Sequence, residues 1–244
     1  MKGLLHQTYI EVRLQLRRRE VLVFTLLLPV LFLIFFGALY GSQKQHGVSY
    51  IDYIVPGYAV FAVMAVALGT LSSNIAFERE FKILKRLGGT PLPRLYLLLA
   101  KIIAGALLAG AVIAVLLLFG TFAFHAHLHG NILGSLAVLA VGVLSFAAIG
   151  IAIGGTVKPD SAVAVGNLIY LALSFLGGVF IQLDQFPSGL LTVARFLPSE
   201  HMVHAMQSMW TFGEGLNQVG GDLLVTAAWG AAAVIFGARR FRWM

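Results

Sequence analysis

Long apolar runs alternate with short polar stretches along most of the chain. Because an α-helix rises about 1.5 Å per residue, about 20 apolar residues cross the hydrocarbon core of a bilayer. One uncharged stretch is too long for a single crossing, and the polar sequence HAHLHGN at 125–131 divides it. The pattern therefore predicts an all-α integral membrane protein with six transmembrane helices, at residues 21–41, 53–77, 102–124, 132–156, 161–183 and 221–238.

The segment before the first span has the periodicity of a surface helix. Within residues 1–20, Leu5, Tyr9, Val12 and Leu16 fall on one helical face. We expect an N-terminal amphipathic helix that lies on the inner membrane surface, with lipid as its partner. A solvated basic tail is the alternative, which the regular apolar face disfavours. The basic residues assigned to the membrane surface are Arg13, Arg17, Arg18 and Arg19.

The segment between the last two spans, residues 184–218, is too apolar for a solvated loop. Pro187 and Pro198 interrupt it too strongly for a span. We expect two short helices, at about 188–196 and 199–211, that dip into the outer half of the membrane. Irregular backbone is tolerated at that depth only where protein or a water-filled cavity surrounds it.

The basic residues predict the orientation. With six spans, 15 of the 17 lysines and arginines fall on the side of the two termini, and only Lys44 and Arg195 fall on the other. The positive-inside rule then places both termini in the cytoplasm. We expect a multi-pass protein of a bacterial or archaeal inner membrane. This distribution accounts for the net charge of +7, so no nucleic acid partner is expected.

Composition limits the chemistry that the chain can perform. Charged residues make up 11% of the chain, against about 25% in a soluble domain, and the mean hydropathy is +0.90. No glycine is followed by lysine, so the phosphate-binding loop of ATPases is absent. No ionisable residue lies in the central part of a predicted span, which disfavours ion-coupled transport. Uphill transport would therefore need a separate ATPase.

Two histidine clusters are candidates for metal or hydrolytic chemistry. Glu200-His201-x-x-His204 and the HAHLH sequence at 125–129 lack the H-E-x-x-H order of zinc proteases. No G-x-S-x-G nucleophile motif is present. We expect no catalytic residue, no metal and no cofactor bound by this chain. An intramembrane hydrolase that uses His201 and His204 stays open as an alternative of another class.

Polar residues and helix-breaking residues near the spans mark a candidate translocation path. Asn74 and Asn167 are the central amides, and Phe196 and Pro198 lie in the interrupted outer segment. For the two amides, ordinary hydrogen bonding between helices is the favoured role, and a place in the path is the alternative.

Small residues four positions apart allow close contact between helices. Gly150 with Gly154 and Ala106 with Gly110 have this spacing. In a chain with 27 glycines such pairs arise easily, so packing within the chain is favoured over dimerisation. Because no repeat or linker is visible, we expect one domain over residues 1–244.

The loop at 78–95 joins the second and third predicted spans and is rich in charge. Phe81, Leu84 and Leu87 fall at helical spacing, and the basic residues take the other side. The pair Gly88-Gly89 is expected to end this short amphipathic helix. A helix held at the inner face by two spans offers a surface for a partner. A basic loop that only sets the topology is the alternative.

The sequence of this loop resembles that of a known family. The pattern E-R-E-x-x-x-L-K-R-L-x-x-T-P-L-P-x-x-x-x-L-x-A-K, which ends at Lys101, is similar to the signature loop of type-2 ABC exporter permeases. This group exports drugs, lipids and polysaccharides. The resemblance implies a coupling helix that docks on an ATPase subunit. The residues that it assigns to ATPase coupling are Glu78, Arg79, Glu80, Lys82, Leu84, Arg86, Thr90 and Pro91.

The resemblance also implies an assembly and a substrate class. Two permeases, as a homodimer or a related heterodimer, would join two ATPase subunits that bind ATP and Mg²⁺. The implied function is export of a hydrophobic or amphipathic compound, drug-like or lipid-like, from the cytoplasm or inner leaflet. A polysaccharide or glycolipid exporter is the alternative within the family.

Overall fold

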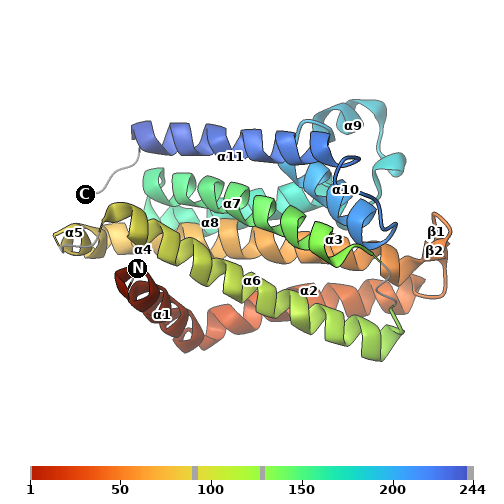
Figure 1. The fold of residues 1–244 in the computed structure, drawn as a ribbon, viewed down its shortest axis with the longest axis horizontal. Helices are drawn as coiled ribbons and strands as arrows, with labels where there is room; N and C mark the ends of the chain where they lie inside the picture. The colour runs from red at the N-terminus through yellow and green to blue at the C-terminus, as the bar shows by residue number, and fades with distance from the viewer. Residues whose placement is uncertain (1, 90–92, 127–129, 241–244) are drawn as a thin grey trace.

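The computed structural model describes residues 2–89, 93–126 and 130–240, and long helices running side by side dominate it (Figure 1). Helix α5 and the end of α11 lie at one end of this bundle, here called the α5 end. The strands β1 and β2 lie at the other end, with α9 and α10 beside them, and we call it the hairpin end. The long helices other than the central one are α2 (Arg19–Tyr40), α6 (Arg94–Phe124), α7 (Ile132–Thr156), α8 (Pro159–Leu176) and α11 (Gly220–Arg240).

One continuous helix forms the centre of the bundle. It comprises α3 (Tyr50–Met64), the π-helical segment η1 (Ala65–Leu71) and α4 (Ser72–Glu80). Its most apolar window is entirely buried inside the protein, and α3 with η1 supplies much of the hydrophobic core. A π-helical turn widens the backbone ring and often marks a functional segment. The neighbouring helices therefore pack around one irregular central element.

Glycines bring two helices close to this central element. A Cβ atom at Gly150 would overlap the carbonyl oxygen of Ala67, and one at Gly154 would overlap that of Ser72. Helix α7 can therefore approach η1 and α4 only with glycine at these positions. A Cβ atom at Gly110 on α6 would meet open space. Gly150 and Gly154 thus serve packing within the chain, as their spacing predicts.

Within the described residues, five helical segments are long and apolar enough to cross a membrane, by length and composition. They are residues 50–80 together with α6, α7, α8 and α11. The first predicted span falls on α2, whose apolar part, Thr25–Tyr40, is shorter. The multi-pass helical class is confirmed. The count of six spans and the cytoplasmic placement of both termini stay predictions.

The helix ends depart from the predicted spans in several places. Helix α7 covers the predicted residues 132–156, whereas α6 begins at Arg94, before residue 102. Helix α8 ends at Leu176 rather than at residue 183, since the chain turns through Gly178 with a φ of +79°. A small hairpin, β1 (Lys44–Gln45) and β2 (Val48–Ser49), was not part of the expected all-helical pattern.

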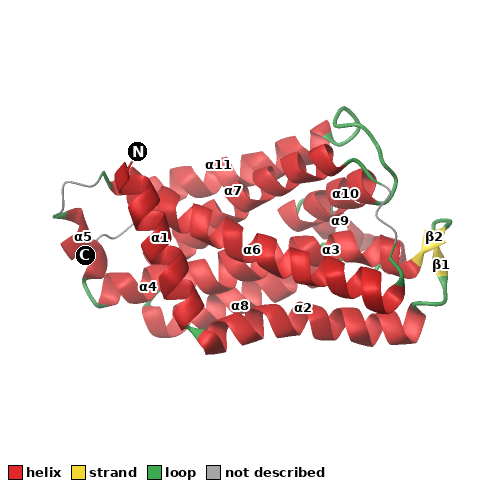
Figure 2. Cartoon of the chain, turned by 60° about the horizontal axis from the view of Figure 1, so that its bottom comes forward, coloured by secondary structure: helices red, strands yellow, loops and turns green. Residues whose placement is uncertain are grey.

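The segments outside the long helices are packed onto the bundle. Helix α1 (Lys2–Arg17) lies at an angle to the long helices near the α5 end (Figure 2). At the hairpin end the chain forms the short 3-10 turn η2 (Leu183–Gln185), then α9 (Ser188–Ala194) and α10 (Pro198–Trp210). Apolar residues of α10 are buried in the core, and Thr211 Oγ1 donates a hydrogen bond of 2.8 Å to the Asp52 carbonyl. Protein therefore surrounds much of α10, whereas α9 is largely exposed, with Val193 at 51%.

Candidate functional site

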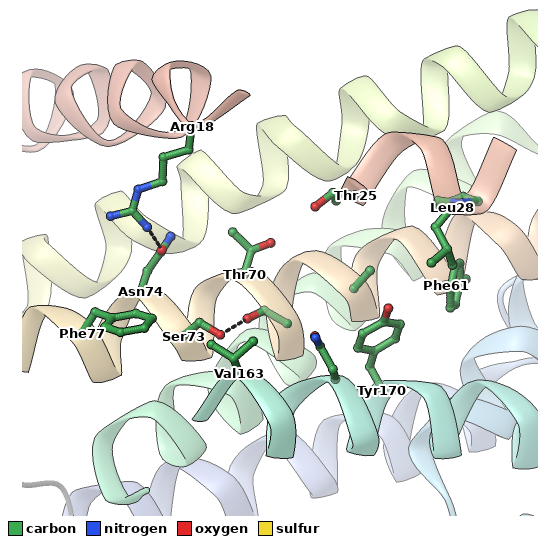
Figure 3. A pocket seen from close by; sticks show the side chains of 14 residues that line it. Arg18, Thr25, Leu28, Phe61, Thr70, Ser73, Asn74, Phe77, Val163 and Tyr170 are labelled. Carbon is green, nitrogen blue, oxygen red and sulfur yellow. Dashed lines mark hydrogen bonds between the residues drawn. The ribbon is translucent and has the colours of Figure 1, made fainter. Parts of the chain in front are cut away.

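A cavity of about 450 Å³, here called the groove, lies between α2, the central helix and α8 (Figure 3). Both apolar and hydrogen-bonding side chains line it, so it suits a ligand with both kinds of surface. The apolar lining includes Leu28, Phe61, Phe77 and Val163, and the polar lining includes Arg18, Thr25, Thr70, Ser73, Asn74, Asn167 and Tyr170.

Arg18 supplies the positive charge of this groove. It sits at the break between α1 and α2, with φ −85° and ψ 70°, so the two helices meet at a bend there. Its guanidinium donates a hydrogen bond to Asn74 Oδ1 on α4 (Figure 3). Nearby, the Ser73 hydroxyl donates to the Gly69 carbonyl at 2.6 Å, which keeps that hydroxyl within its own helix. The groove is therefore cationic at one end and apolar along its wall.

The structure places the four predicted path residues in two different regions. Asn74 and Asn167 line the same groove, from α4 and α8. Phe196 lies exposed at the hairpin end, where its carbonyl accepts a 2.9 Å hydrogen bond from Trp229 Nε1. Pro198 is buried as the first residue of α10. The two amides thus belong to the groove, and the other two residues do not line it.

A second cavity, of about 500 Å³, lies at the hairpin end. Glutamine side chains, tyrosines and the hairpin itself contribute much of its lining, which includes Tyr40, Gln43, Tyr53, Gln182, Gln185 and Gln207. Polar groups that bind water or a hydrophilic headgroup therefore gather at this end.

Aromatic rings separate the two cavities. Phe61 lines the groove, and Phe36 and Phe180 line the second cavity. The ring centroids of Phe61 and Phe180 are 5.2 Å apart, and those of Phe32 and Phe180 are 4.6 Å apart. On the groove side, Tyr170 packs against Phe61 at 5.6 Å. These packed rings form an apolar layer between the two cavities.

The predicted coupling loop forms α5 (Ile83–Gly88) at the end of the central helix. Lys82 has a φ of +56°, in the left-handed region that is uncommon for a residue with a Cβ, and this turn separates α5 from α4. Leu84 is 1% exposed and packs on Ile75 and Ala147. Phe81 is 63% exposed, although its spacing placed it on the apolar face with Leu84. The turn at Lys82 explains the difference, because it interrupts the helical register between them.

The exposed coupling residues form one charged surface around α5. Glu80, Lys82 and Arg86 are exposed, and so is Lys85. Arg86 Nη2 donates a 3.0 Å hydrogen bond to the Phe81 carbonyl, which ties its side chain to the turn before α5. These side chains can therefore be reached by a partner, and their role in ATPase coupling stays a prediction. Thr90 and Pro91 lie outside the described residues.

Two other predicted coupling residues turn into the protein. Arg79 donates hydrogen bonds to the carbonyls of Gly155 and Val157 at the end of α7. Glu78 Oε1 lies 2.6 Å from the ammonium of Lys101. They are therefore positioned to hold α4 in the bundle rather than to contact a partner directly.

A buried charge cluster, which the sequence did not suggest, joins α1 to α4 and α6. Lys101 Nζ also lies 2.8 Å from Glu11 Oε1, and this lysine is only 2% exposed. Gln7 Nε2 donates to the same Glu11 oxygen at 3.0 Å. We call Glu11, Glu78 and Lys101 the charge triad. Buried ions are tolerated only when they are paired, so these contacts fix where α1 sits.

The four arginines assigned to the membrane surface have different surroundings. Arg13 and Arg17 on α1 are exposed. Arg18 reaches the groove, and the side chain of Arg19 falls outside the described part of the structure.

A multi-pass helical protein with an amphipathic groove, and with an exposed charged helix at one end, has the features of a membrane transport subunit. Comparison with known proteins supports this class. The model of the ABC-2 type transporter family matches residues 6–210, which is most of the chain. The chain belongs to this family, and the resemblance carried by the loop is confirmed.

Several transport permeases are similar to this chain. YvfS of Bacillus subtilis, which carries the name of a transport permease, is 26% identical over 203 residues, covering 82% of each protein. The inner membrane transport permease YadH of Escherichia coli is 27% identical over 195 residues, covering 77% of this chain and 75% of YadH. YbhS of Escherichia coli, named a probable multidrug ABC transporter permease, is 25% identical over 165 residues, covering 66% of this chain and 43% of YbhS.

Membership of the family indicates which part of a transporter this chain forms. The matched domain is the transmembrane part of a transporter and carries no ATPase domain. Permeases of this family work with an ABC ATPase partner. The chain is therefore a multi-pass membrane permease of a family that works with an ABC ATPase partner.

Proposed function

We propose that this permease exports a hydrophobic or amphipathic compound, drug-like or lipid-like, out of the cytoplasm or inner leaflet. The observation that carries the proposal is the line of two cavities separated by aromatic rings. The groove offers an apolar wall and the Arg18 guanidinium, which suits a lipid-like or drug-like molecule with a polar headgroup. Once the substrate has crossed the aromatic rings, the second cavity offers glutamine and tyrosine groups to the same headgroup.

The proposed complex contains two permeases and two ABC ATPases in a bacterial or archaeal inner membrane. ATP and Mg²⁺ bind to the ATPase subunits. With six spans and both termini in the cytoplasm, the α5 end faces the ATPases and the hairpin end faces outward. The related YbhS, named as a probable multidrug permease, supports a drug-like substrate. A polysaccharide or glycolipid substrate is the runner-up, and family membership favours transport over hydrolysis at His201 and His204.

In this proposal α4 transmits the movement of the ATPase. It continues into the exposed α5 through the turn at Lys82. Its Glu78 contacts Lys101 of α6, which also contacts Glu11 of α1. Its Arg79 contacts the end of α7, and its Asn74 contacts Arg18 in the groove. A displacement of α5 would therefore reach the groove along α4 through Asn74, and would reach α6 and α7 through Glu78 and Arg79.

Charge reversal on the exposed surface tests the coupling role. Glu80→Lys with Arg86→Glu is expected to abolish co-purification of the ATPase and leave the thermal unfolding of the permease unchanged, because both side chains are exposed. Asp160→Asn, which neutralises an exposed charge on α8, is the control and should retain the ATPase. If the double variant co-purifies as much ATPase as the wild type, the proposal that this surface binds the ATPase is refuted.

The substrate class is tested with the complete complex in proteoliposomes. ATP-dependent movement of a fluorescent phospholipid or of a hydrophobic dye is expected, and a hydrophilic oligosaccharide should not move. Transport of the oligosaccharide alone would reject the lipid-like and drug-like class and favour the runner-up.

A further inference from the structure

Four titratable side chains meet where α10 and α11 begin, at the hairpin end and away from both the groove and the coupling surface (Figure 1). Glu200, His201 and His204 come from α10, and Asp222 comes from the first turn of α11. Burial raises the pKa of Glu200, and the hydrogen bond to Asp222 raises the pKa of His204. Neither the proposed transport path nor the coupling surface uses this cluster.

The ligand atoms of three of these residues converge. His201 Nδ1 lies 2.6 Å from Asp222 Oδ1 and 3.4 Å from Glu200 Oε2. One donor atom from each of Glu200, His201 and Asp222 lies within 4.8 Å of the others. The other oxygen of Asp222, Oδ2, contacts His204 Nδ1 at 2.8 Å. One imidazole nitrogen and two carboxylate oxygens thus face a common point.

The second nitrogen of His201 restricts what can occupy that point. His201 Nε2 lies 2.9 Å from the carbonyl oxygen of Arg195, which can only accept a hydrogen bond, so Nε2 carries a proton. In a neutral imidazole the lone pair is then on Nδ1 and faces the carboxylate of Asp222. Two lone pairs at this distance repel each other unless a cation lies between them.

A proton alone would leave one carboxylate oxygen without a hydrogen bond. Bound to Nδ1, it would be donated to Asp222 Oδ1, the nearer oxygen. Glu200 Oε2 is buried and has no hydrogen-bond partner among the described residues. A buried acceptor without a partner costs about 1–3 kcal/mol, and more when it is charged. A divalent cation would satisfy Nδ1 and both carboxylates at once.

We propose that Glu200, His201 and Asp222 bind a divalent transition-metal ion, with zinc as the best match to this set of nitrogen and oxygen ligands. The hydrogen bond from His201 Nε2 to a backbone carbonyl is the arrangement that usually orients a metal-bound histidine. His204 is a positioning residue, because it holds the remaining oxygen of Asp222. Three protein ligands leave a fourth position for water.

Such an ion would fasten the re-entrant helix α10 to α11. The spacing Glu200-His201-x-x-His204 alone does not predict a metal site, because the third ligand lies on another helix, 18 residues beyond His204. An ion that joins the two helices would stabilise the outer segment that closes the hairpin end.

The test uses the full chain in detergent after removal of any histidine-containing tag and treatment with EDTA. Dialysis against ZnCl₂ followed by elemental analysis should give about one zinc per chain, and calorimetric titration should give its affinity. Asp222→Asn and His201→Gln are expected to lower that affinity at least 100-fold, and His204→Gln to lower it about 10- to 100-fold. The matched control is His125→Asn, an exposed histidine outside the cluster, which should bind as the wild type does.

A thermal readout separates loss of the site from loss of the fold. Zinc should raise the unfolding temperature of the wild type, because it binds the folded state, and should not raise that of Asp222→Asn. Glu200→Gln keeps the size of the side chain and should also lose the response. Wild-type protein that binds no zinc, or variants that bind it as tightly as the wild type, would overturn the proposal.

Discussion

Replacing Lys101 by methionine should destabilise the permease strongly, because the lysine is the positive centre of the charge triad. Its ammonium lies 2.8 Å from Glu11 Oε1 and 2.6 Å from Glu78 Oε1. Methionine matches much of the length of the side chain but removes the charge. Two buried carboxylates would then face each other without a cation between them.

The size of the effect follows from this geometry. Since both oxygens contact one nitrogen, they lie within about 5 Å of each other, and at an effective dielectric constant of about 20 their repulsion is about 3 kcal/mol. Removal of one partner from a buried ion pair typically costs about 3–5 kcal/mol. For a chain of this length each kcal/mol shifts the unfolding temperature by about 2–4 °C, so Lys101→Met should lower it by about 6–20 °C.

The assay is thermal unfolding of the purified permease, with Lys85→Met as the matched control. Lys85 is exposed on α5, so its variant should melt within a degree or two of the wild type. A triple variant, Glu11→Gln with Glu78→Gln and Lys101→Met, should recover much of the loss, because no unpaired charge remains. The role of the charge triad would be refuted if Lys101→Met unfolds at the temperature of the wild type. It would also be refuted if the triple variant is as unstable as Lys101→Met.

Two further predictions concern the packing of α7. Gly150→Ala should destabilise the protein by about 1–3 kcal/mol in thermal unfolding, since the new methyl group meets the Ala67 carbonyl. The control Gly110→Ala should be neutral or slightly stabilising. Equal effects of the two substitutions would refute the packing role of Gly150. Arg79→Gln should lose its charged hydrogen bonds to the end of α7, so transport should fall severalfold while the ATPase still co-purifies. Unchanged transport would contradict the proposal that α4 transmits the movement of the ATPase.

The hydropathy of the sequence predicts the membrane class well, since it depends only on composition over about 20 residues. It predicts helix ends less well. Helix α6 begins at Arg94, because a charged first turn does not prevent a helix from continuing to the membrane surface. The π-helical form of residues 65–71 and the left-handed turn at Lys82 also have no signal in the apolar pattern, because that pattern indicates only which side chains are buried.

The coupling loop shows where residue periodicity succeeds and where it fails. Amphipathic spacing places Leu84 inward and Arg86 outward, as observed. The same spacing gives no reason for Glu78 and Arg79 to turn inward, since charged residues next to a basic loop look like solvent-exposed ones. Their partners are Lys101 on α6, Gly155 on α7 and Val157 just after α7. Only the tertiary arrangement distinguishes a charge that faces a partner from one that holds the bundle together.

Lys101 nevertheless carries a signal that depends on its position along α6. It follows Leu97 by four residues and precedes Ala104 by three, and both of these residues are buried. A side chain with that spacing must lie on the buried stripe of the helix. A lysine on such a stripe requires a nearby carboxylate, because an unpaired buried ammonium is too costly. The positive-inside rule counts this lysine only as one more cytoplasmic charge, whereas its place on the buried stripe of α6 marks it as an ion that needs a carboxylate. That Glu11 and Glu78 are the partners follows only from the packing of α1 and α4 against α6.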